Sequence, residues 1–283
     1  MNVQIIIDST VDLRPAVREK CAVVPLTVTF GSKEYTDGVT IDHKAFYEML
    51  CESDVLPTTS QPTPDAFARE YQKVVDAGRK AVVLTIASQF SGTCQSATIA
   101  AMDFPGSIFV VDSHTAAIGV GILAELAVSL AEKGLAAEEI VEILEKEREN
   151  VRLIAMLDTL EYLKRGGRIS KTVAFAGEML SIKPVVNIAE GKINILGKAR
   201  GSKQGSNLLV REIQNAGGVD FDKPCLLGYT GMSDALLQKY VRDSADLWEG
   251  HIDELYGAPI GSVIGTHAGP GAIAAAFFSK GVE

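Results

Sequence analysis

Alternation of short apolar runs with helix-forming segments in the first half of the chain constrains the fold most. Predicted strands cover residues 3–7, 21–28, 81–86 and 107–111, and predicted helices cover 43–52, 64–77, 93–101 and 116–132. Strands that alternate with helices favour an α/β fold, in which helices flank a mainly parallel sheet. Ligands of such sheets bind beyond the carboxyl ends of the strands.

The pattern changes after about residue 150. Glu190-Gly191 is a hairpin signal between predicted strands at 183–189 and 192–196. Other predicted strands cover 151–157, 224–228 and 252–260, with helices at 202–215 and 233–249. We therefore predict an N-terminal α/β domain (1–150) and a C-terminal α+β domain with an antiparallel sheet (151–283).

Composition narrows the classes of function. A formal net charge of −9 argues against general nucleic-acid binding. No apolar run approaches the ~20 residues of a membrane span, and the N-terminus leads straight into a strand instead of a signal peptide. The four cysteines are scattered, as is typical of free thiols in a reducing compartment. We expect a cytoplasmic protein without structural zinc or another metal site.

Polar loops follow three of the predicted strands, at residues 8–10, 88–93 and 112–115. Ser91 stands just before the predicted helix 93–101, where unpaired amide groups and the helix dipole favour an anion. The alternative is an ordinary serine cap of that helix. Taken alone, the loop allows both interpretations.

Two glycine-rich segments resemble nucleotide-binding motifs but differ from them in context. Residues 119–124 fit GxGxxA, yet they begin several residues after the preceding strand ends. Residues 197–203 lack the P-loop spacing and follow a hairpin, and no GxSxG nucleophile motif occurs. Close helix packing explains the glycines of 119–124 better.

A basic segment at 163–170 carries Arg165 and Arg168 around two glycines. Two guanidinium groups at such a turn can bind a phosphate or an acidic surface, although solvated arginines at a helix end are an equal alternative. Further positive charge follows at Lys198, Arg200 and Lys203. In an otherwise acidic chain, this charge favours one specific anionic partner.

Taken together, six segments resemble the DegV family. They are DSTVDL at 8–13, TSQP at 59–62, FSGTCQSA at 90–97, VDS at 111–113, YLKRGGRI at 162–169 and GTHAGPG at 265–271. The resemblance spans nearly the whole chain and implies an α/β domain, an α+β domain and a fatty acid between them. It also implies a binding subunit of bacterial fatty acid kinase, with no cofactor and no catalysis of its own. Such a subunit presents the carboxylate to a separate ATP-binding subunit, which makes acyl phosphate for phospholipid synthesis.

The resemblance implies roles for particular residues. The fatty acid carboxylate would bind the hydroxyls of Thr59 and Ser91 and the amide of Gly92, with Ser60 nearby and His267 joining from the second domain. The surface that faces the kinase subunit would include Arg168 and Arg200, with Arg165 adjacent. The chain departs from the family pattern at Ala87, Gln89 and Cys94. These departures leave the head-group residues intact but bear on the shape of the tunnel near the carboxylate.

Two alternatives belong to other classes. A serine hydrolase would use Ser91 with His267 and would need an acid such as Asp8 or Asp112 to orient the histidine. An enzyme that binds a nucleotide or a phosphate ester would use the basic glycine-rich loop.

Overall fold

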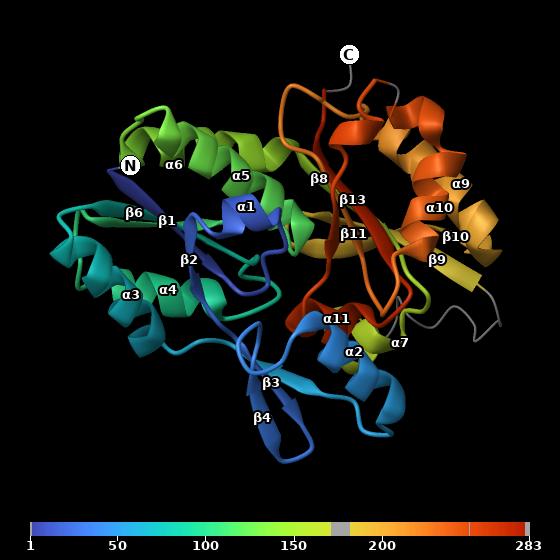
Figure 1. Cartoon of the computed structure of the whole chain (residues 1–283), viewed down its shortest axis with the longest axis horizontal. Coiled ribbons are helices and arrows are strands. Elements are labelled where there is room, and N and C mark those ends of the chain that lie inside the picture. The colour runs from blue at the N-terminus through green and yellow to red at the C-terminus, as the bar shows by residue number, and fades with distance from the viewer. Residues whose placement is uncertain (1, 171–181, 249, 281–283) are drawn as a thin grey trace.

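The computed structural model of the protein describes residues 2–170, 182–248 and 250–280. Figure 1 shows two lobes side by side, each built on one sheet, and a small third sheet below their junction. Within these ranges, no helix has both the length and the apolar character needed to cross a membrane.

The first lobe is built on a parallel sheet of strand order β2-β1-β6-β7. Its strands are β1 (Val3–Asp8), β2 (Cys21–Val24), β6 (Lys80–Thr85) and β7 (Ile108–Asp112). Its helices are α1 (Pro15–Arg18), α3 (Pro64–Asp76), α4 (Thr93–Ala101), α5 (Ile118–Glu132) and α6 (Ala137–Glu147), with α3 and α4 on one face and α5 and α6 on the other (Figure 1). Because strand residues alternate faces, Ile6 packs toward α3 and α4, whereas Ile5 and Ile7 pack toward α5. The predicted α/β fold is confirmed.

The predicted strand 21–28 is wrong in one respect, because the chain forms two strands there that belong to different sheets. Pro25 lacks the amide hydrogen that a continuous ladder needs, and β2 ends just before it. After the proline, β3 (Thr27–Phe30) joins a three-stranded antiparallel sheet with β4 (Lys33–Thr36) and β5 (Thr58–Ser60). The predicted helix 43–52 is α2 (His43–Glu52), which packs near this sheet.

The second lobe contains a six-stranded sheet of order β10-β9-β8-β13-β11-β12. Its strands are β8 (Val151–Met156), β9 (Ile182–Ala189), β10 (Lys192–Arg200), β11 (Leu226–Tyr229), β12 (Gly257–Pro259) and β13 (Ile273–Phe278). Its helices are α7 (Glu161–Arg165), α9 (Gly201–Asn215), α10 (Ala235–Asp243) and α11 (Ser262–Ala268). All neighbouring strands are antiparallel except the parallel pair β11–β12, so the α+β expectation holds with a mixed sheet.

Several boundaries differ from the predictions. The predicted helix 233–249 begins at Ala235 and ends at Asp243, where the Ser244 hydroxyl donates to the Tyr240 carbonyl and accepts from the Trp248 indole. The predicted strand 252–260 shrinks to β12, preceded by a single 3-10 turn. Helices α6 and α11 and strand β13 were not predicted. The division near residue 150 falls between β7 and β8 and stays a prediction.

The glycines of segment 119–124 serve packing. The segment lies inside α5, and a Cβ on Gly121 would come within 2.1 Å of the Asp12 carbonyl oxygen. Such an approach between backbones excludes any larger residue. The structure therefore supports the packing interpretation over a dinucleotide site.

The predicted hairpin turn at Glu190-Gly191 joins β9 to β10 and also contacts the first lobe. Lys192 pairs with Ala189, which leaves a two-residue loop, and both loop residues have positive φ (50° and 67°). The Gly191 amide donates to the His114 carbonyl oxygen at 3.0 Å. The turn thus positions the second sheet against the loop that follows β7.

We predict that Glu190→Asn stabilises the protein by a few tenths to about 1 kcal/mol, because asparagine tolerates positive φ better than glutamate. Thermal unfolding would measure the gain. Gly191→Ala is the matched control with the opposite sign, since a residue with a Cβ is strained at φ 67° and would also displace the Gln89 side chain. An unchanged or lower melting temperature for Glu190→Asn would contradict the prediction.

Candidate functional site

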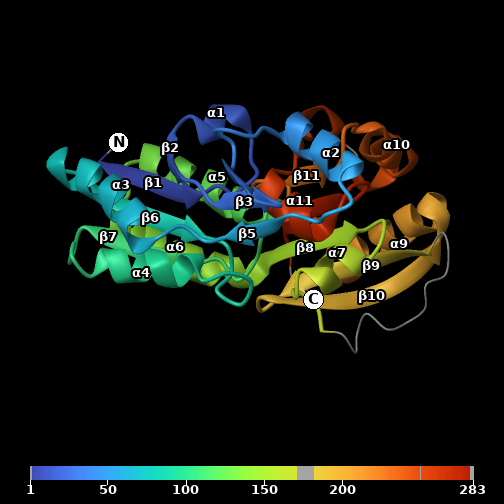
Figure 2. The same ribbon diagram turned by 90° about the horizontal axis from the view of Figure 1, so that it is seen from below.

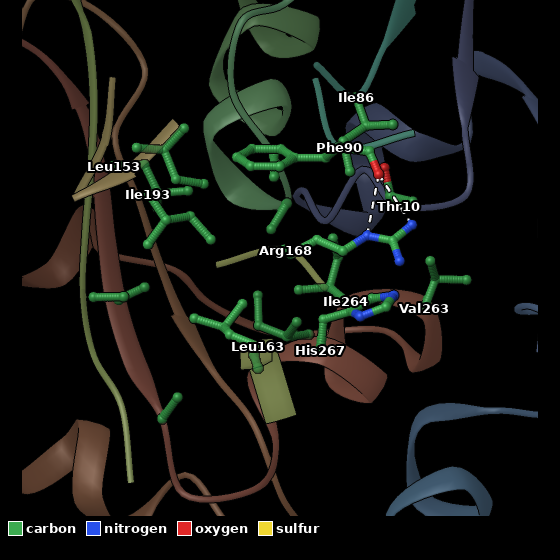
Figure 3. Close-up of a pocket in the computed structure, with 18 of the residues that line it drawn as sticks. Thr10, Ile86, Phe90, Leu153, Leu163, Arg168, Ile193, Val263, Ile264 and His267 are labelled. Carbon is green, nitrogen blue, oxygen red and sulfur yellow. Dashed lines mark hydrogen bonds between the residues drawn. The ribbon is translucent and has the colours of Figure 1, made fainter. Parts of the chain in front are cut away.

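A cavity of about 400 Å³ lies where the three sheets meet. Figure 2 shows β3, β5 and α11 together at the junction of the two lobes. Polar groups line one part of the cavity wall and apolar side chains the rest (Figure 3). The polar lining residues are Thr10, Thr59, Ser60, Gln61, Ser91, Arg168, Asn187, Thr230 and His267.

The apolar wall comes from one face of the second sheet. On β8, Leu153 and Ala155 line the cavity, whereas Ile154 and Met156 belong to the core that includes α9. Strand alternation therefore gives this sheet two apolar faces. One packs against α9, and the other packs partly against α5 and partly lines the cavity. Neighbouring strands extend the wall with Val186, Ile188, Ile193 and Ala274.

Ser91 reaches the cavity on the loop between β6 and α4. Its Oγ lies 2.8 Å from Thr93 Oγ1 and accepts from the Thr93 amide at 3.3 Å. The N-cap of α4 is Gly92, one residue later than the capping alternative proposed, and Gly92 also lines the cavity. The hydroxyl of Ser91 and the backbone of Gly92 therefore sit at the positive end of a nine-residue helix.

Two carboxylates, the buried Asp8 and the partly exposed Asp112, hold the three polar loops together. Asp8 Oδ1 accepts from the Thr10 amide and Oδ2 accepts from the Ile86 amide, both at 2.8 Å. Asp112 accepts from the amides of Ser88 and His114. Both carboxylates therefore accept hydrogen bonds from the loop backbone instead of lining the cavity.

Thr59 on β5 contacts His267 on α11, although 208 positions separate the two residues in the sequence. Thr59 Oγ1 lies 3.0 Å from His267 Nε2. With the ring proton on Nε2, the histidine donates to Thr59, whose own hydroxyl hydrogen is then left to donate to a ligand. The other ring nitrogen, Nδ1, is buried without a partner, and only glycine fits at position 166, since a Cβ there would lie 2.2 Å from Nδ1.

Burial, together with weaker repulsion from the nearby Arg168 guanidinium, lowers the pKa of His267 from 6.5 to about 4. The imidazole is therefore neutral at physiological pH. It contributes a hydrogen bond to this end of the cavity but no charge.

The three arginines of the sequence prediction occupy different surroundings. Arg168 is half-buried and lines the cavity, where Nε and Nη2 donate to the Phe90 carbonyl oxygen at 3.2 and 3.1 Å and Nη1 donates to the Gly166 carbonyl oxygen at 2.7 Å. Figure 3 shows its guanidinium next to Phe90 and His267. Arg165 is exposed and pairs with Glu161 at 2.6 Å, and Arg200 is exposed at the end of β10.

The geometry does not support the hydrolase alternative. Ser91 bonds to Thr93 instead of His267, and His267 bonds to Thr59. Among the described residues, no acid reaches His267 Nδ1. Loop amides already donate to the carboxylates of Asp8 and Asp112. A nucleophile–base–acid arrangement is thus absent from this part of the chain.

Sequence reasoning missed several residues of the site. Gln61 lines the cavity and donates to Ser96 Oγ at 3.0 Å, and the Phe90 carbonyl anchors Arg168. Gln61 belongs to the TSQP segment at 59–62. Its position beside Thr59 and Ser60 was the sequence signal that could have identified it as a site residue. The apolar wall could have been found from the alternation in β8 once the face toward the first lobe was known.

We predict that His267 makes the folded state less stable as pH falls. The unfolded chain takes up this proton near pH 6.5 and the folded chain only near pH 4. The contribution of His267 to the free energy of unfolding is therefore fully present above pH 6.5 and is lost as the pH falls from 6.5 to 4. Relative to His267→Gln, which keeps a donor for Thr59, the wild type should lose on the order of 3 kcal/mol between neutral pH and pH 4. Urea unfolding at several pH values measures the difference. Parallel pH profiles for the two proteins would contradict the prediction.

Comparison with known proteins gives one family. The model of the DegV family, described as uncharacterised, matches residues 2–280. A DegV domain-containing protein of Deinococcus radiodurans is 33% identical over 98% of each chain. A solved DegV family protein from Thermus thermophilus, described by its fatty acid binding, has a TM-score of 0.87 and 32% identity over 98% of this chain and 100% of that one. A stearic acid-binding protein from Eubacterium ventriosum has a TM-score of 0.85 and 26% identity over 98% of each chain. With its two lobes and the cavity between them, this chain belongs to the DegV family.

Proposed function

We propose that this protein binds one long-chain fatty acid in the cavity between its lobes. The tail would lie along the apolar face of the second sheet. The carboxylate would lie near Thr59, Ser60, Ser91, Gly92 and His267. The observation that carries the proposal is a cavity with a long apolar wall and hydroxyl donors gathered at one end. Binding of fatty acids by the solved relatives supports it.

Burial of the tail accounts for most of the affinity. Each buried methylene contributes ~0.8 kcal/mol, so a chain of about fourteen contributes roughly 11 kcal/mol before the cost of ordering it. A hydrogen bond to a charged group adds only ~1.5–3 kcal/mol. The tail therefore determines how tightly the ligand binds, and the hydroxyls determine its direction.

The head group needs no base. A carboxylic acid is already ionised at neutral pH, and the amide groups that begin α4 favour a negative charge beside Ser91. Hydroxyl donors such as Thr59 and Ser91 complete the hydrogen bonding. The same set offers no nucleophile–base pair, so we infer a binding protein that does not itself catalyse a reaction.

We further propose that the protein presents the carboxylate to a separate ATP-binding subunit of a fatty acid kinase. That subunit would form the acyl phosphate that enters phospholipid synthesis in the cytoplasm. The motif resemblance supports this role, together with basic side chains in an acidic chain. Exposed Arg165 and Arg200, with Arg168 nearer the cavity, are the proposed contacts.

Removing one donor tests the carboxylate site. Ser91→Ala and Thr59→Ala should each weaken binding of a long-chain fatty acid by about ten- to a hundredfold, because each removes one hydrogen bond to a charge. Isothermal titration calorimetry measures the change. Ser88→Ala is the matched control, since Ser88 is exposed on the same loop and does not line the cavity.

Binding of the corresponding fatty alcohol separates the contribution of the head group to affinity from that of the tail. The alcohol keeps the apolar chain but lacks the charge, so it should bind the wild type more weakly than the acid. If the alcohol binds as well as the acid and neither substitution changes affinity, the carboxylate does not lie at Ser91 and Thr59.

Arg200→Ala tests the kinase contact. Because Arg200 is exposed and does not line the cavity, its loss should reduce acyl-phosphate formation with the kinase subunit at least tenfold and leave fatty acid affinity unchanged. Arg211→Ala removes another exposed arginine of the same lobe and is the control. Arg168→Ala is less selective, since it also frees the Phe90 carbonyl. Normal turnover by Arg200→Ala would exclude Arg200 from the interface.

A further inference from the structure

A second cavity, of about 220 Å³, lies between the lobes and shares no lining residue with the first. Its walls come from the loop after β1, the turn after β4 and the segment that begins α11. The charged and titratable groups on these walls are Asp12, Arg18, Asp37, His43 and Tyr256. Its polar character contrasts with the apolar wall of the fatty acid cavity.

Asp12 and Asp37 each use one carboxylate oxygen to hold the start of α11. The Gly261 amide donates to Asp12 Oδ1 at 2.9 Å, and the Ser262 hydroxyl donates to Asp37 Oδ1. Helix capping therefore explains the Oδ1 atoms. It does not explain the second oxygen of either carboxylate.

Both Oδ2 atoms are buried without a hydrogen-bond partner. The Asp12 and Asp37 residues are only 8% and 5% exposed, and both line the cavity. A buried carboxylate oxygen without a partner is costly unless a proton or a cation satisfies it. Burial accordingly raises the pKa of both carboxyls.

The two carboxylates lie close together beside Gly261. A Cβ built on Gly261 would lie 3.4 Å from Asp12 Oδ1 and 3.8 and 3.9 Å from the two oxygens of Asp37. A single ion could therefore contact oxygens of both side chains, directly or through water.

Carboxyl groups outnumber lysine and arginine side chains around this cavity. Asp8 lies close enough to repel them, so three carboxylates share this region. The Arg18 guanidinium faces them, but its Nη1 donates to the Val11 carbonyl oxygen. Both ring nitrogens of His43 lie at backbone carbonyl oxygens, of Ile260 and Gly231, so this ring offers no nitrogen to a ligand. Among the residues that line the cavity, Arg18 is the one arginine or lysine.

We propose that this second cavity binds a partly hydrated divalent cation of the magnesium class through Asp12 and Asp37. Oxygen is the donor that hard cations prefer, and magnesium is commonly held by one or two carboxylates and several waters. The cavity has room for such waters. Among the described residues, no three His, Cys, Asp or Glu side chains converge on one point, which excludes an all-protein cage there.

The cation would act on α11. The Asp12 and Asp37 carboxylates hold the first turn of this helix, and His267 lies near its other end. An ion that fixes both carboxylates would also fix the helix that carries His267. The site is nevertheless separate from the lipid, so cation binding and fatty acid binding can be measured independently.

Binding of manganese to the metal-free full-length protein tests the proposal, with electron paramagnetic resonance reporting the free ion. We expect one saturable site that magnesium competes for. Asp12→Asn and Asp37→Asn should each weaken manganese binding at least tenfold, because asparagine keeps an acceptor for α11 but loses the charge. Asp54→Asn is the control, since it removes an exposed carboxylate of the same lobe.

Two results would overturn the proposal. One is the lack of saturable manganese binding by the wild type, which would leave a proton as the partner of the carboxylates. The other is equal binding by the Asp12, Asp37 and Asp54 variants. If the Asp12 and Asp37 variants do not fold, the melting temperature of the wild type tests the proposal instead. It should rise saturably with added magnesium chloride, and by more than it rises with choline chloride of equal ionic strength. The absence of such a rise would refute the site.

Discussion

The attachment of α11 to the first lobe is the interaction on which the rest of the site depends. This helix has seven residues, too few to be stable alone, and its first turn is held by hydrogen bonds to Asp12 and Asp37. The bond between the Gly261 amide and Asp12 joins residues 249 positions apart. With its start fixed in this way, α11 places His267 against Thr59, which belongs to the small sheet of the other lobe. The polar end of the cavity thus exists only when the lobes are together.

The apolar part of the cavity depends on a different constraint, the two faces of one sheet. Ile154 and Met156 pack with Leu209 and Ile213 of α9, so the second lobe has a core without any ligand. Leu153 and Ala155, on the opposite face, line the cavity, and Leu153 also packs in the core that includes α5. A bound fatty acid would therefore complete the burial of this face and stabilise the protein by mass action, without being needed to form the lobe.

Local signals in the sequence predicted the local parts of this structure well. Helix α4 runs from Thr93 to Ala101 as predicted, because its start follows a small-residue loop and its interior contains no breaker. The split at Pro25 could have been read from the missing amide, but the partner sheet of β3 could not. The contact between Thr59 and His267 spans 208 residues, and it was the family resemblance, not any periodicity, that paired them. The kinase-facing role of the arginines stays a prediction, and the unsatisfied oxygens of Asp12 and Asp37 had no sequence signal at all.

The chemistry of the polar end suits a carboxylate that must remain reactive. Arg168, the guanidinium nearest this end, uses Nε, Nη1 and Nη2 on backbone carbonyls, and His267 is neutral. A bidentate ion pair with arginine would hold a carboxylate more strongly, but it would also withdraw charge from the oxygens. Hydroxyl donors orient the group while leaving most of its charge in place. If the carboxylate accepts a phosphoryl group, as proposed, neutral donors combined with a tightly buried tail let the protein bind the fatty acid firmly without weakening its nucleophile.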